Sequence, residues 1–307
     1  MPPGSDPAAT RDAAVTLTAP AKLNLNLRIT GRRADGYHLL DSVVVFTEFG
    51  DRLTIRRPRD PDLDGDRLNI TGPFRRDMPA LDADNICLRA VQAFRAADGV
   101  CGPLHIQLDK QIPAGAGLGG GSSDAAVILR HLNDTSPQPL SAERLADVAL
   151  SLGADVPVCL AGAAQRMTGI GENLDRLLPA PTGEVVLARP DIALSTPDVF
   201  ARLNLASPAR STDSGADIDV GSDCDAETRT DAATLIAVGN DLRAAAEELA
   251  PSIADLLSAL AACAGSRAAQ MSGSGSACFG LFRDKASADA AAVRLRAAGY
   301  WAVATRF

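Results

Sequence analysis

Apolar and polar residues alternate strictly near the start of the chain. In residues 15–29, the side chains of Leu23, Leu25, Leu27 and Ile29 share one face of an extended strand. The residues between them are Lys22, Asn24, Asn26 and Arg28, and they share the other face. The pattern therefore predicts a strand with one apolar and one polar face. A solvated polar face is the ordinary interpretation, but asparagine is uncommon in strands unless something uses it.

Hydrophobic periodicity predicts mixed strands and helices along the rest of the chain. Strands are predicted at 104–108, 184–190, 276–282 and 300–307, with two more in 37–57 separated at Gly50–Asp51. Helices are predicted at 85–97, from about Ser122 to 133, at 141–153 and at 286–299. The pattern in residues 238–265 predicts either one helix or two helices separated at Pro251.

The sequences between these elements are typical of turns, loops and one extended segment. A turn is predicted at residues 31–37, and residues 58–83 are predicted to be mostly loop. An extended segment is predicted at 154–162. Residues 204–232, rich in Asp, Ser and Thr, predict a long solvated loop, and residues 1–13 a disordered tail. Together these elements predict an α+β fold in two layers, with a division of the chain near residues 170–180.

Composition narrows the class of protein. The chain has 307 residues, enough for two domains, and a net charge of -8, which disfavours non-specific nucleic-acid binding. No apolar run approaches the roughly 20 residues of a membrane helix, and the N-terminus lacks a secretory signal. The six cysteines form no C-x-x-C pair, and there are only three histidines. We therefore expect a cytoplasmic protein without a zinc site or a disulfide framework.

The stretch "PAGAGLGGGSSDAA", residues 113–126, lies between a predicted strand and a predicted helix. It lacks the lysine of a P-loop. Gly115, Gly117 and Gly120 match G-x-G-x-x-G, but a second helix follows where a dinucleotide-binding unit needs a strand. A flexible linker fits poorly between ordered elements. We expect a phosphate-binding loop, in which backbone N–H groups and a helix N-terminus receive an anion.

Three stretches resemble motifs of the GHMP kinase family, in the family's order. They are "APAKLNLNL" near the N-terminus, the glycine loop, and "MSGSGSACFG" near the C-terminus. The resemblance runs from about residue 14 to the end. It implies the two-domain α+β GHMP kinase fold. Residues 14–175 would form an N-terminal domain like ribosomal protein S5, and residues 176–307 a C-terminal ferredoxin-like α/β domain.

The same resemblance implies an ATP-dependent kinase of a small alcohol. "PAKLNLNLRITGRRADGYHLL" and "GADVPV" are similar to a branch of the family whose acceptor is a cytidine diphosphate-linked polyol of the non-mevalonate isoprenoid pathway. Its 2-hydroxyl would receive the phosphoryl group, with Mg²⁺ as the metal. Alternatives are another GHMP kinase, such as homoserine kinase, or a non-catalytic nucleotide-binding regulator. We expect neither nucleic acid nor membrane as a partner, and a monomer or a homodimer.

Catalytic roles follow from the resemblance for Lys22 and Asp155. Asp155 would orient the acceptor hydroxyl and accept its proton, and Lys22 would pair with Asp155. On residue type alone, Asp155 after Gly153 is a cap or turn residue, and Lys22 is a solvated strand residue.

The resemblance also implies the binding residues. The ATP phosphates would contact Pro113, Ala114, Gly115, Ala116, Gly117, Leu118, Gly119, Gly120, Gly121, Ser122 and Ser123. Ser123 could also meet the Mg²⁺ bound to ATP, and Asn85 and Lys110 would contact the nucleotide. Asn85 could equally be the N-cap of its helix.

The acceptor would contact a second set of residues. These are Asn24, Tyr37, His38, Thr196, Phe200, Gly273 and Gly275. Tyr37 would stack on the cytosine ring and His38 would hydrogen-bond it, whereas residue type alone favours a core role for Tyr37. Gly273 and Gly275 could also form a simple turn into the following strand.

Overall fold

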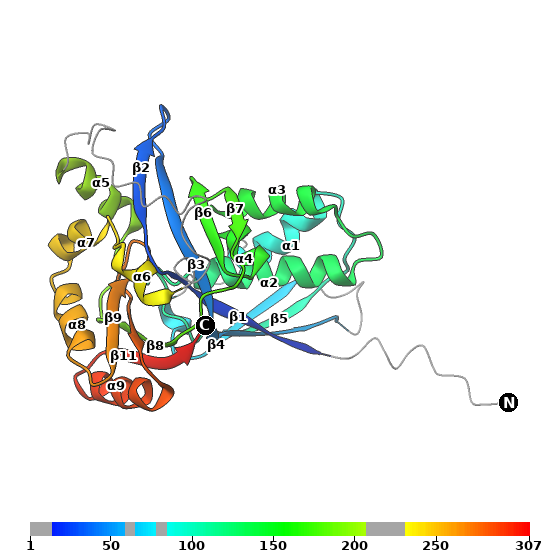
Figure 1. Cartoon of the computed structure of the whole chain (residues 1–307). Coiled ribbons are helices and arrows are strands. Elements are labelled where there is room, and N and C mark those ends of the chain that lie inside the picture. The colour runs from blue at the N-terminus through cyan, green and yellow to red at the C-terminus, as the bar shows by residue number, and fades with distance from the viewer. Residues whose placement is uncertain (1–13, 59–64, 78–84, 207–230) are drawn as a thin grey trace. The chain divides into compact units, whose positions relative to one another are not determined.

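The structure is a computed structural model that describes residues 14–58, 65–77, 85–206 and 231–307 (Figure 1). Contacts divide the chain into two compact units. Unit 1 comprises the chain up to Pro20, Gly50–Ala114 and Gly120–Leu160, and unit 2 comprises Ala21–Phe49, Gly115–Gly119 and Ala161–Phe307. The predicted domain boundary between residues 175 and 176 stays a prediction.

The strands of unit 1 are held by long-range pairing. The end of β3 (His38–Arg56) runs antiparallel to β5 (His105–Asp109), which runs parallel to β4 (Arg67–Thr71). The first strand, β1 (Val15–Asn24), begins in this unit and also pairs with β3. Apolar residues opposite one another, such as Leu53 and Leu108, are completely buried.

Helices supply the rest of the core of unit 1. They are α1 (Ile86–Ala96), α2 (Gly120–Thr135), α3 (Ala142–Leu152) and the short α4 (Val156–Ala161), with a 3₁₀ turn at Arg75–Asp77. The first three pack against one another, as Figure 1 shows. Asn85 caps α1 and Ser141 caps α3, each by accepting a hydrogen bond from a backbone N–H of the first turn.

Two predictions in this unit are wrong, and a third is wrong in part. β3 continues through Gly50–Asp51, where a break was expected. A Cβ on Gly50 would lie 2.2 Å from the carbonyl oxygen of Ala19, so the glycine permits close approach of a neighbouring strand. Residues 156–161 form α4, not an extended piece, since Pro157 is tolerated in a first helical turn. The predicted loop at 58–83 contains β4 and the 3₁₀ turn.

Unit 2 contains the hairpin of β2 (Arg28–Arg32) and the start of β3, joined by the predicted turn. β3 also pairs with β6 (Gln165–Gly169), which pairs with β7 (Asn173–Arg176). The expected strand over 15–29 is interrupted, because β1 ends at Asn24 and β2 begins at Arg28.

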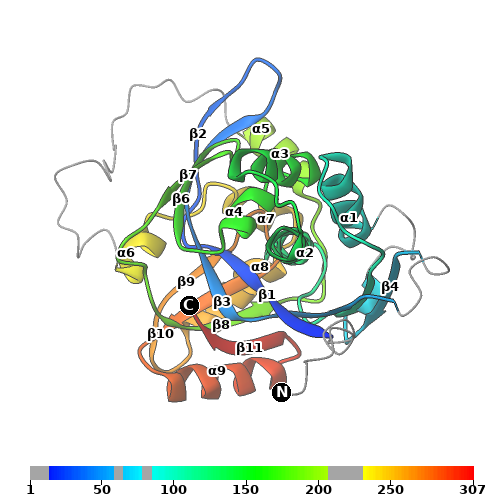
Figure 2. The ribbon, with the colours of Figure 1, turned by 90° about the vertical axis from the view of Figure 1, so that its right-hand side faces the viewer.

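The second sheet of unit 2 is antiparallel and has four strands. Its order is β11 (Trp301–Arg306), β8 (Glu184–Arg189), β10 (Cys278–Phe282) and β9 (Ser266–Met271). Helices α8 (Ser252–Ala261) and α9 (Lys285–Ala297) pack on it, and Figure 2 shows α9 alongside β11. Apolar residues of the helices and the strands form the core of this unit.

The described part of unit 2 contains three further helices, α5 (Thr196–Ala206), α6 (Ala232–Ala237) and α7 (Arg243–Leu249). The interruption between α7 and α8 falls at Pro251, one of the two predicted possibilities. Of the predicted loop at 204–232, residues 207–230 lie outside the described residues, as does the predicted tail. The described ends of that loop segment belong to α5 and α6.

The α+β prediction is confirmed by the mixed helices and sheets of both units. None of the described helices is long and apolar enough to cross a membrane.

Candidate active site

Three sequence motifs that lie far apart in the chain meet in unit 2. The backbone N–H of Lys22 donates to the carbonyl of Leu118 in the glycine loop at 2.8 Å. The backbone N–H of Asn24 donates to Ser272 Oγ at 3.2 Å, and Ser272 Oγ donates to the carbonyl of Gly117 at 3.1 Å. The hydroxyl of Ser272 thus joins the first and third motifs to the glycine loop.

Glycine is required in this loop by both conformation and space. Gly115, Gly117 and Gly119 have positive φ angles of 62°, 75° and 64°. A Cβ on Gly117 would lie 2.4 Å from the carbonyl oxygen of Ser272, whereas a Cβ on Gly115 would meet nothing within 4 Å. The loop is therefore closely packed at one glycine and open at another, which suits a backbone that receives an anion.

Lys22 lies against this loop. A Cβ on Gly119 would lie 3.1 Å from Lys22 Cβ and 3.3 Å from its Cε, so the lysine stem runs beside the glycine. The side chains of Lys22, Asn24 and Asn26 are all buried. The interpretation of this strand face as solvated is therefore wrong for these three residues, whereas Arg28 is exposed.

Asn24 is only 1% exposed, and its side-chain amide is hydrogen-bonded through the nitrogen. Its Nδ2 donates to Ser42 Oγ at 2.8 Å, while its Oδ1 has no hydrogen-bond partner among the described residues. A Cβ on Gly273, whose φ is +57°, would lie 3.4 Å from that oxygen. The third motif thus passes close to the free amide oxygen.

The residues predicted to bind the base belong to unit 2. The Tyr37 side chain is 63% exposed, so a core role for it is wrong. The His38 ring stacks on Phe200 of α5, with centroids 4.9 Å apart. Thr196 Oγ1, also on α5, shares a hydrogen bond of 2.7 Å with Ser274 Oγ of the third motif. The contacts predicted for Gly275, which has a φ of +84°, stay predictions.

In unit 1, Asn85 is the N-cap of α1, and its Oδ1 accepts from the N–H of Cys87 at 3.0 Å. Its buried Nδ2 has no partner among the described residues. The cap interpretation is confirmed, and the nucleotide contact stays a prediction.

Lys110 belongs to a buried triad with Asp51 and Asp124. Its Nζ lies 2.5 Å from Asp51 Oδ2 and 2.9 Å from Asp124 Oδ2. Burial alone would lower the pKa of Lys110, but the two carboxylates, Asp124 foremost, raise it above its ordinary value. A Cβ on Gly120 would lie 2.9 Å from Nζ, so the triad lies beneath the start of α2. The nucleotide contact of Lys110 stays a prediction.

Asp124 is the least well satisfied member of this triad. The pKa of Asp124 is raised to about 7, mainly by burial and also by the neighbouring Asp51, although Lys110 acts in the opposite direction. Its Oδ1 is buried without a partner among the described residues. Asp51 is better satisfied, because its Oδ1 accepts from the backbone N–H groups of Gln111 and Ile112.

Asp155 lies one residue before α4, and its carbonyl accepts from the N–H of Cys159 at 3.2 Å. This position agrees with a residue at a helix start. The side chain is half-buried. Its pairing with Lys22 joins residues of different units and stays a prediction.

The phosphate contacts of residues 113–123 also stay predictions. Within this segment, α2 begins at Gly120, two residues before the predicted start, and Ser123 is buried in its first turn.

Sequence reasoning missed four side chains that organise these sites: Ser42, Ser272, Asp51 and Asp124. Ser272 and Asp124 stand inside motifs that were singled out for their glycines. Ser42 and Asp51 have no local signal, since each acts through residues distant in the sequence.

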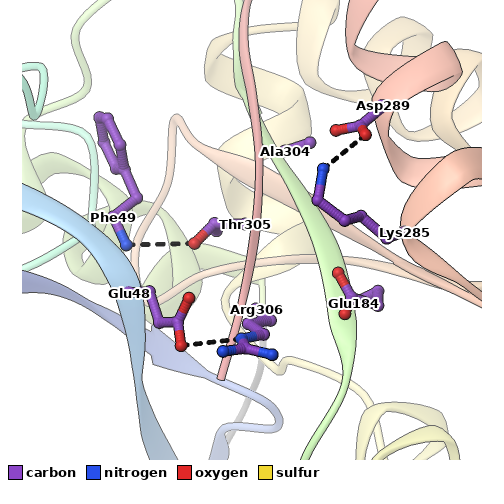
Figure 3. A pocket seen from close by; sticks show the side chains of 8 residues that line it. All are labelled: Glu48, Phe49, Glu184, Lys285, Asp289, Ala304, Thr305 and Arg306. Carbon is purple, nitrogen blue, oxygen red and sulfur yellow. Dashed lines mark hydrogen bonds and ion pairs between the residues drawn. The ribbon is translucent and has the colours of Figure 1, made fainter.

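A pocket of about 510 Å³ lies elsewhere in unit 2 (Figure 3). Its charged side chains are largely paired, with Glu48 bound to Arg306 at 2.7 Å and Lys285 to Asp289 at 2.6 Å. It is lined by none of the predicted site residues.

Comparison with known proteins places these motifs in a family. Residues 85–163 match the GHMP kinases N terminal domain, and residues 225–300 match the GHMP kinases C terminal model. A 4-diphosphocytidyl-2-C-methyl-D-erythritol kinase of Cereibacter sphaeroides is 44% identical over 92% of this chain and 95% of its own length. The protein of that name from Paracoccus denitrificans is 44% identical over 94% of each chain.

Solved structures agree in fold. A crystal structure of 4-(cytidine 5'-diphospho)-2C-methyl-D-erythritol kinase covers 95% of this chain and 98% of its own, with a TM-score of 0.73 and 33% identity. A homoserine kinase from Cytophaga hutchinsonii covers 95% of this chain and 94% of its own, with a TM-score of 0.65 and 16% identity, which shows the fold alone. The chain therefore belongs to the GHMP kinases, and among them to the 4-diphosphocytidyl-2-C-methyl-D-erythritol kinases, ATP-dependent kinases of a small molecule.

Proposed function

We propose that this kinase transfers the γ-phosphoryl group of ATP to the 2-hydroxyl of 4-diphosphocytidyl-2-C-methyl-D-erythritol. The products are the 2-phosphate and ADP, in the non-mevalonate isoprenoid pathway. One observation carries the proposal: the backbone of Lys22 is bonded to the glycine loop, and Ser272 of the third motif bonds both Asn24 and that loop. Identity of 44% to named relatives over most of the chain supports the choice of acceptor.

ATP would bind with its phosphates at the glycine loop and the start of α2. The open space around Gly115 and the positive φ of the alternate glycines support this placement. Backbone N–H groups at a helix N-terminus favour an anion through their unpaired donors and the helix dipole.

Transfer would proceed by attack of the acceptor oxygen on the γ-phosphorus. A new O–P bond forms, the bond from the γ-phosphorus to the bridging oxygen breaks, and ADP leaves with that electron pair. Asp155 would accept the proton of the hydroxyl, and the Lys22 ammonium would stabilise the charge on the moving group.

Acceptor recognition would rest on the base. The exposed ring of Tyr37 is free to stack on cytosine, and His38 follows it directly at the start of β3. Phe200 and Thr196, which contact His38 and Ser274, would complete the base site.

Mg²⁺ belongs to the same proposal. Among the described residues, no cluster of three or more His, Cys, Asp or Glu side chains could hold a metal ion. The metal would therefore be bound mainly by the ATP phosphates, with the Ser123 hydroxyl in the first turn of α2 as a protein ligand. A cytoplasmic location and a monomer or homodimer complete the proposal.

An acceptor panel tests the proposal. ADP release should require the diphosphocytidyl polyol, and homoserine or mevalonate should not replace it. Free CDP should compete with the acceptor and not with ATP. Phosphorylation of homoserine with no competition by CDP would favour another GHMP kinase, and ATP binding without transfer to any alcohol would favour a regulator.

Replacing Tyr37 tests the base contact. Tyr37→Ala should weaken acceptor binding by about 1–3 kcal/mol, the scale of base–aromatic stacking, and raise the acceptor KM about tenfold to a hundredfold. Tyr37→Phe should be mild, because the ring remains. Steady-state kinetics with each substrate varied should show an unchanged KM for ATP. Val293→Ala, which shortens another exposed apolar side chain, is the control. Equal acceptor KM values for Tyr37→Ala and wild type would exclude the stacking role.

A further inference from the structure

Ser42 lies on β3 with its side chain completely buried. Its Oγ lies 2.6 Å from the carbonyl oxygen of Asn26 and 2.8 Å from Nδ2 of Asn24. Both asparagines belong to the first motif. A serine hydroxyl therefore sits between the backbone of one asparagine and the side chain of another.

The proton of this hydroxyl can serve only one of the two partners. A carbonyl oxygen accepts and never donates, so Ser42 must donate its hydrogen to Asn26. Ser42 Oγ is then left as an acceptor toward Asn24. The Asn24 amide must turn its NH₂ group to Ser42 and its Oδ1 away from it, and chemistry fixes the orientation that geometry alone would leave ambiguous.

The Oδ1 that is turned away is a buried acceptor without a partner among the described residues. It lies beside Gly273, where a Cβ would come within 3.4 Å. The backbone of Asn24 cannot relieve this, since its N–H is bound to Ser272 Oγ. A buried acceptor left unpaired destabilises the protein by about 1–3 kcal/mol, so a ligand that donates a hydrogen bond here gains affinity.

The chemistry of this oxygen identifies the kind of ligand group that it can bind. An amide oxygen attracts a hydroxyl hydrogen and repels the oxygens of a phosphate, which are acceptors at neutral pH. The matching group is therefore a donor such as a hydroxyl and not a phosphate of ATP, and in the proposed function, in which Asn24 contacts the acceptor, it is a hydroxyl of the acceptor alcohol.

We propose that Ser42 is a positioning residue that locks the Asn24 amide with Oδ1 toward a hydroxyl of the acceptor alcohol. The proposal rests on the proposed function, in which Asn24 contacts the acceptor. It assigns to Ser42 a role in acceptor binding although Ser42 itself touches no substrate.

The test compares Ser42→Ala and Ser42→Thr with the control Thr47→Val. Thr47 is a buried residue on the same strand, and its Oγ1 likewise donates to a backbone carbonyl, that of Phe49, at 2.8 Å. Ser42→Ala frees the amide to rotate, so kcat/KM for the acceptor should fall about tenfold, about 1.4 kcal/mol. KM for ATP should not change. Ser42→Thr keeps the hydroxyl and should stay within about threefold of wild type.

A structural readout separates this inference from the proposed function. In wild type without substrate, the ¹⁵N side-chain resonance of Asn24, assigned by its loss in Asn24→Asp, should show NH₂ hydrogens that exchange slowly with water. The exchange should accelerate in Ser42→Ala and not in Thr47→Val. Slow exchange in a protein that transfers phosphate to no cytidine-linked acceptor would support the lock while the proposed function fails.

Other results would overturn the inference. They are fast exchange in wild type, an equal loss of acceptor kcat/KM in Ser42→Ala and Thr47→Val, or a parallel rise in KM for ATP. If Ser42→Ala does not fold, Ser42→Cys, with a weak acceptor of similar size, should show the same selective loss, and wild-type kinetics in Ser42→Cys would contradict the lock.

Discussion

Asp155 is the residue on which the chemistry of the proposed reaction depends most. It stands immediately before α4, half-buried, and its backbone begins the first turn of that helix. Asp155→Asn keeps the shape of the side chain and removes its negative charge. We expect kcat to fall by about a hundredfold or more, the scale of a lost general base, with both KM values nearly unchanged.

Single-turnover kinetics and calorimetry of both substrates would measure this effect. Asp147→Asn is the matched control, because Asp147 is an exposed carboxylate of the preceding helix in the same unit. If kcat of Asp155→Asn stayed within about threefold of wild type, Asp155 would have no part in proton transfer.

Individual residues were predictable where the signal is local. Ser141 as a helix cap follows from its own position before an amphipathic run, and the structure bears it out. The buried state of Lys22, Asn24 and Asn26 was not predictable from alternation, because alternation separates two faces and cannot tell which partner covers each. The covering residues, such as Ser272 and Leu118, come from distant segments.

The glycine loop is an element whose shape depends on residues without side chains. Gly119 has a φ of +64°, and a Cβ there would lie 3.1 Å from Lys22 Cβ. Left-handed backbone costs a non-glycine residue about 1–2 kcal/mol, and a branched side chain would also displace Lys22. Gly119→Val should therefore raise KM for ATP by about tenfold or more, while CDP still binds.

Calorimetric titration with an ATP analogue and with CDP would distinguish the two effects. Gly299→Ala is the control, because Gly299 also has a positive φ, +90°, yet nothing lies within 4 Å of an added Cβ. It should lower stability slightly and leave ATP affinity unchanged. Wild-type ATP affinity in Gly119→Val would show that the phosphates bind elsewhere.

The start of α2 lies against the buried triad of Lys110, Asp51 and Asp124, of which Asp124 belongs to the helix itself. Burial raises the pKa of Asp124 to about 7 in the folded protein, whereas in the unfolded chain it is about 3.9. Between these values the folded protein binds more protons than the unfolded chain, so stability falls as the pH rises from about 4 to 7. Asp124→Asn removes this titration and should flatten the decline.

Urea denaturation at pH 5 and pH 8 would measure the change in unfolding free energy for each protein. Asp289→Asn, at a half-exposed surface pair on α9, should decline as wild type does. An equal decline in Asp124→Asn and wild type would mean that Asp124 is ionised throughout this range.

Elements with strong periodicity were predictable, and those that depend on partners were not. The Gly50–Asp51 pair has the composition of a turn, yet Gly50 admits the Ala19 backbone and Asp51 is buried against Lys110. β4 was missed because it is short, and its pairing with β5 comes from a segment more than thirty residues later. In α4 the two valines around Pro157 favour an extended prediction, but local hydrogen bonds form a helix there.

At the scale of the whole molecule, the chain passes repeatedly between the two units. It crosses after Pro20, Phe49, Ala114, Gly119 and Leu160, and β3 contributes residues to both units. No local pattern in the sequence announces these crossings, because membership of a unit depends on long-range pairing. Because of these crossings, neither unit is a single continuous segment of the chain. One unit therefore cannot unfold without disturbing the chain segments that run into the other.

We therefore expect the two units to unfold together, and two buried cysteines can report on this. Cys87 lies in unit 1 and Cys278 in unit 2, and both are completely buried. Burial raises the pKa of each thiol well above its ordinary value, so neither supplies the reactive thiolate in the folded state. Alkylation of either should then require global opening and proceed at one shared rate, after correction for intrinsic reactivity. Peptide-level mass spectrometry in low urea would measure both rates in the wild-type chain, with the partly exposed Cys101 as the fast internal reference. A rate for Cys278 that exceeds that of Cys87 by tenfold or more, or the reverse, would mean that one unit opens alone in spite of the shared strand.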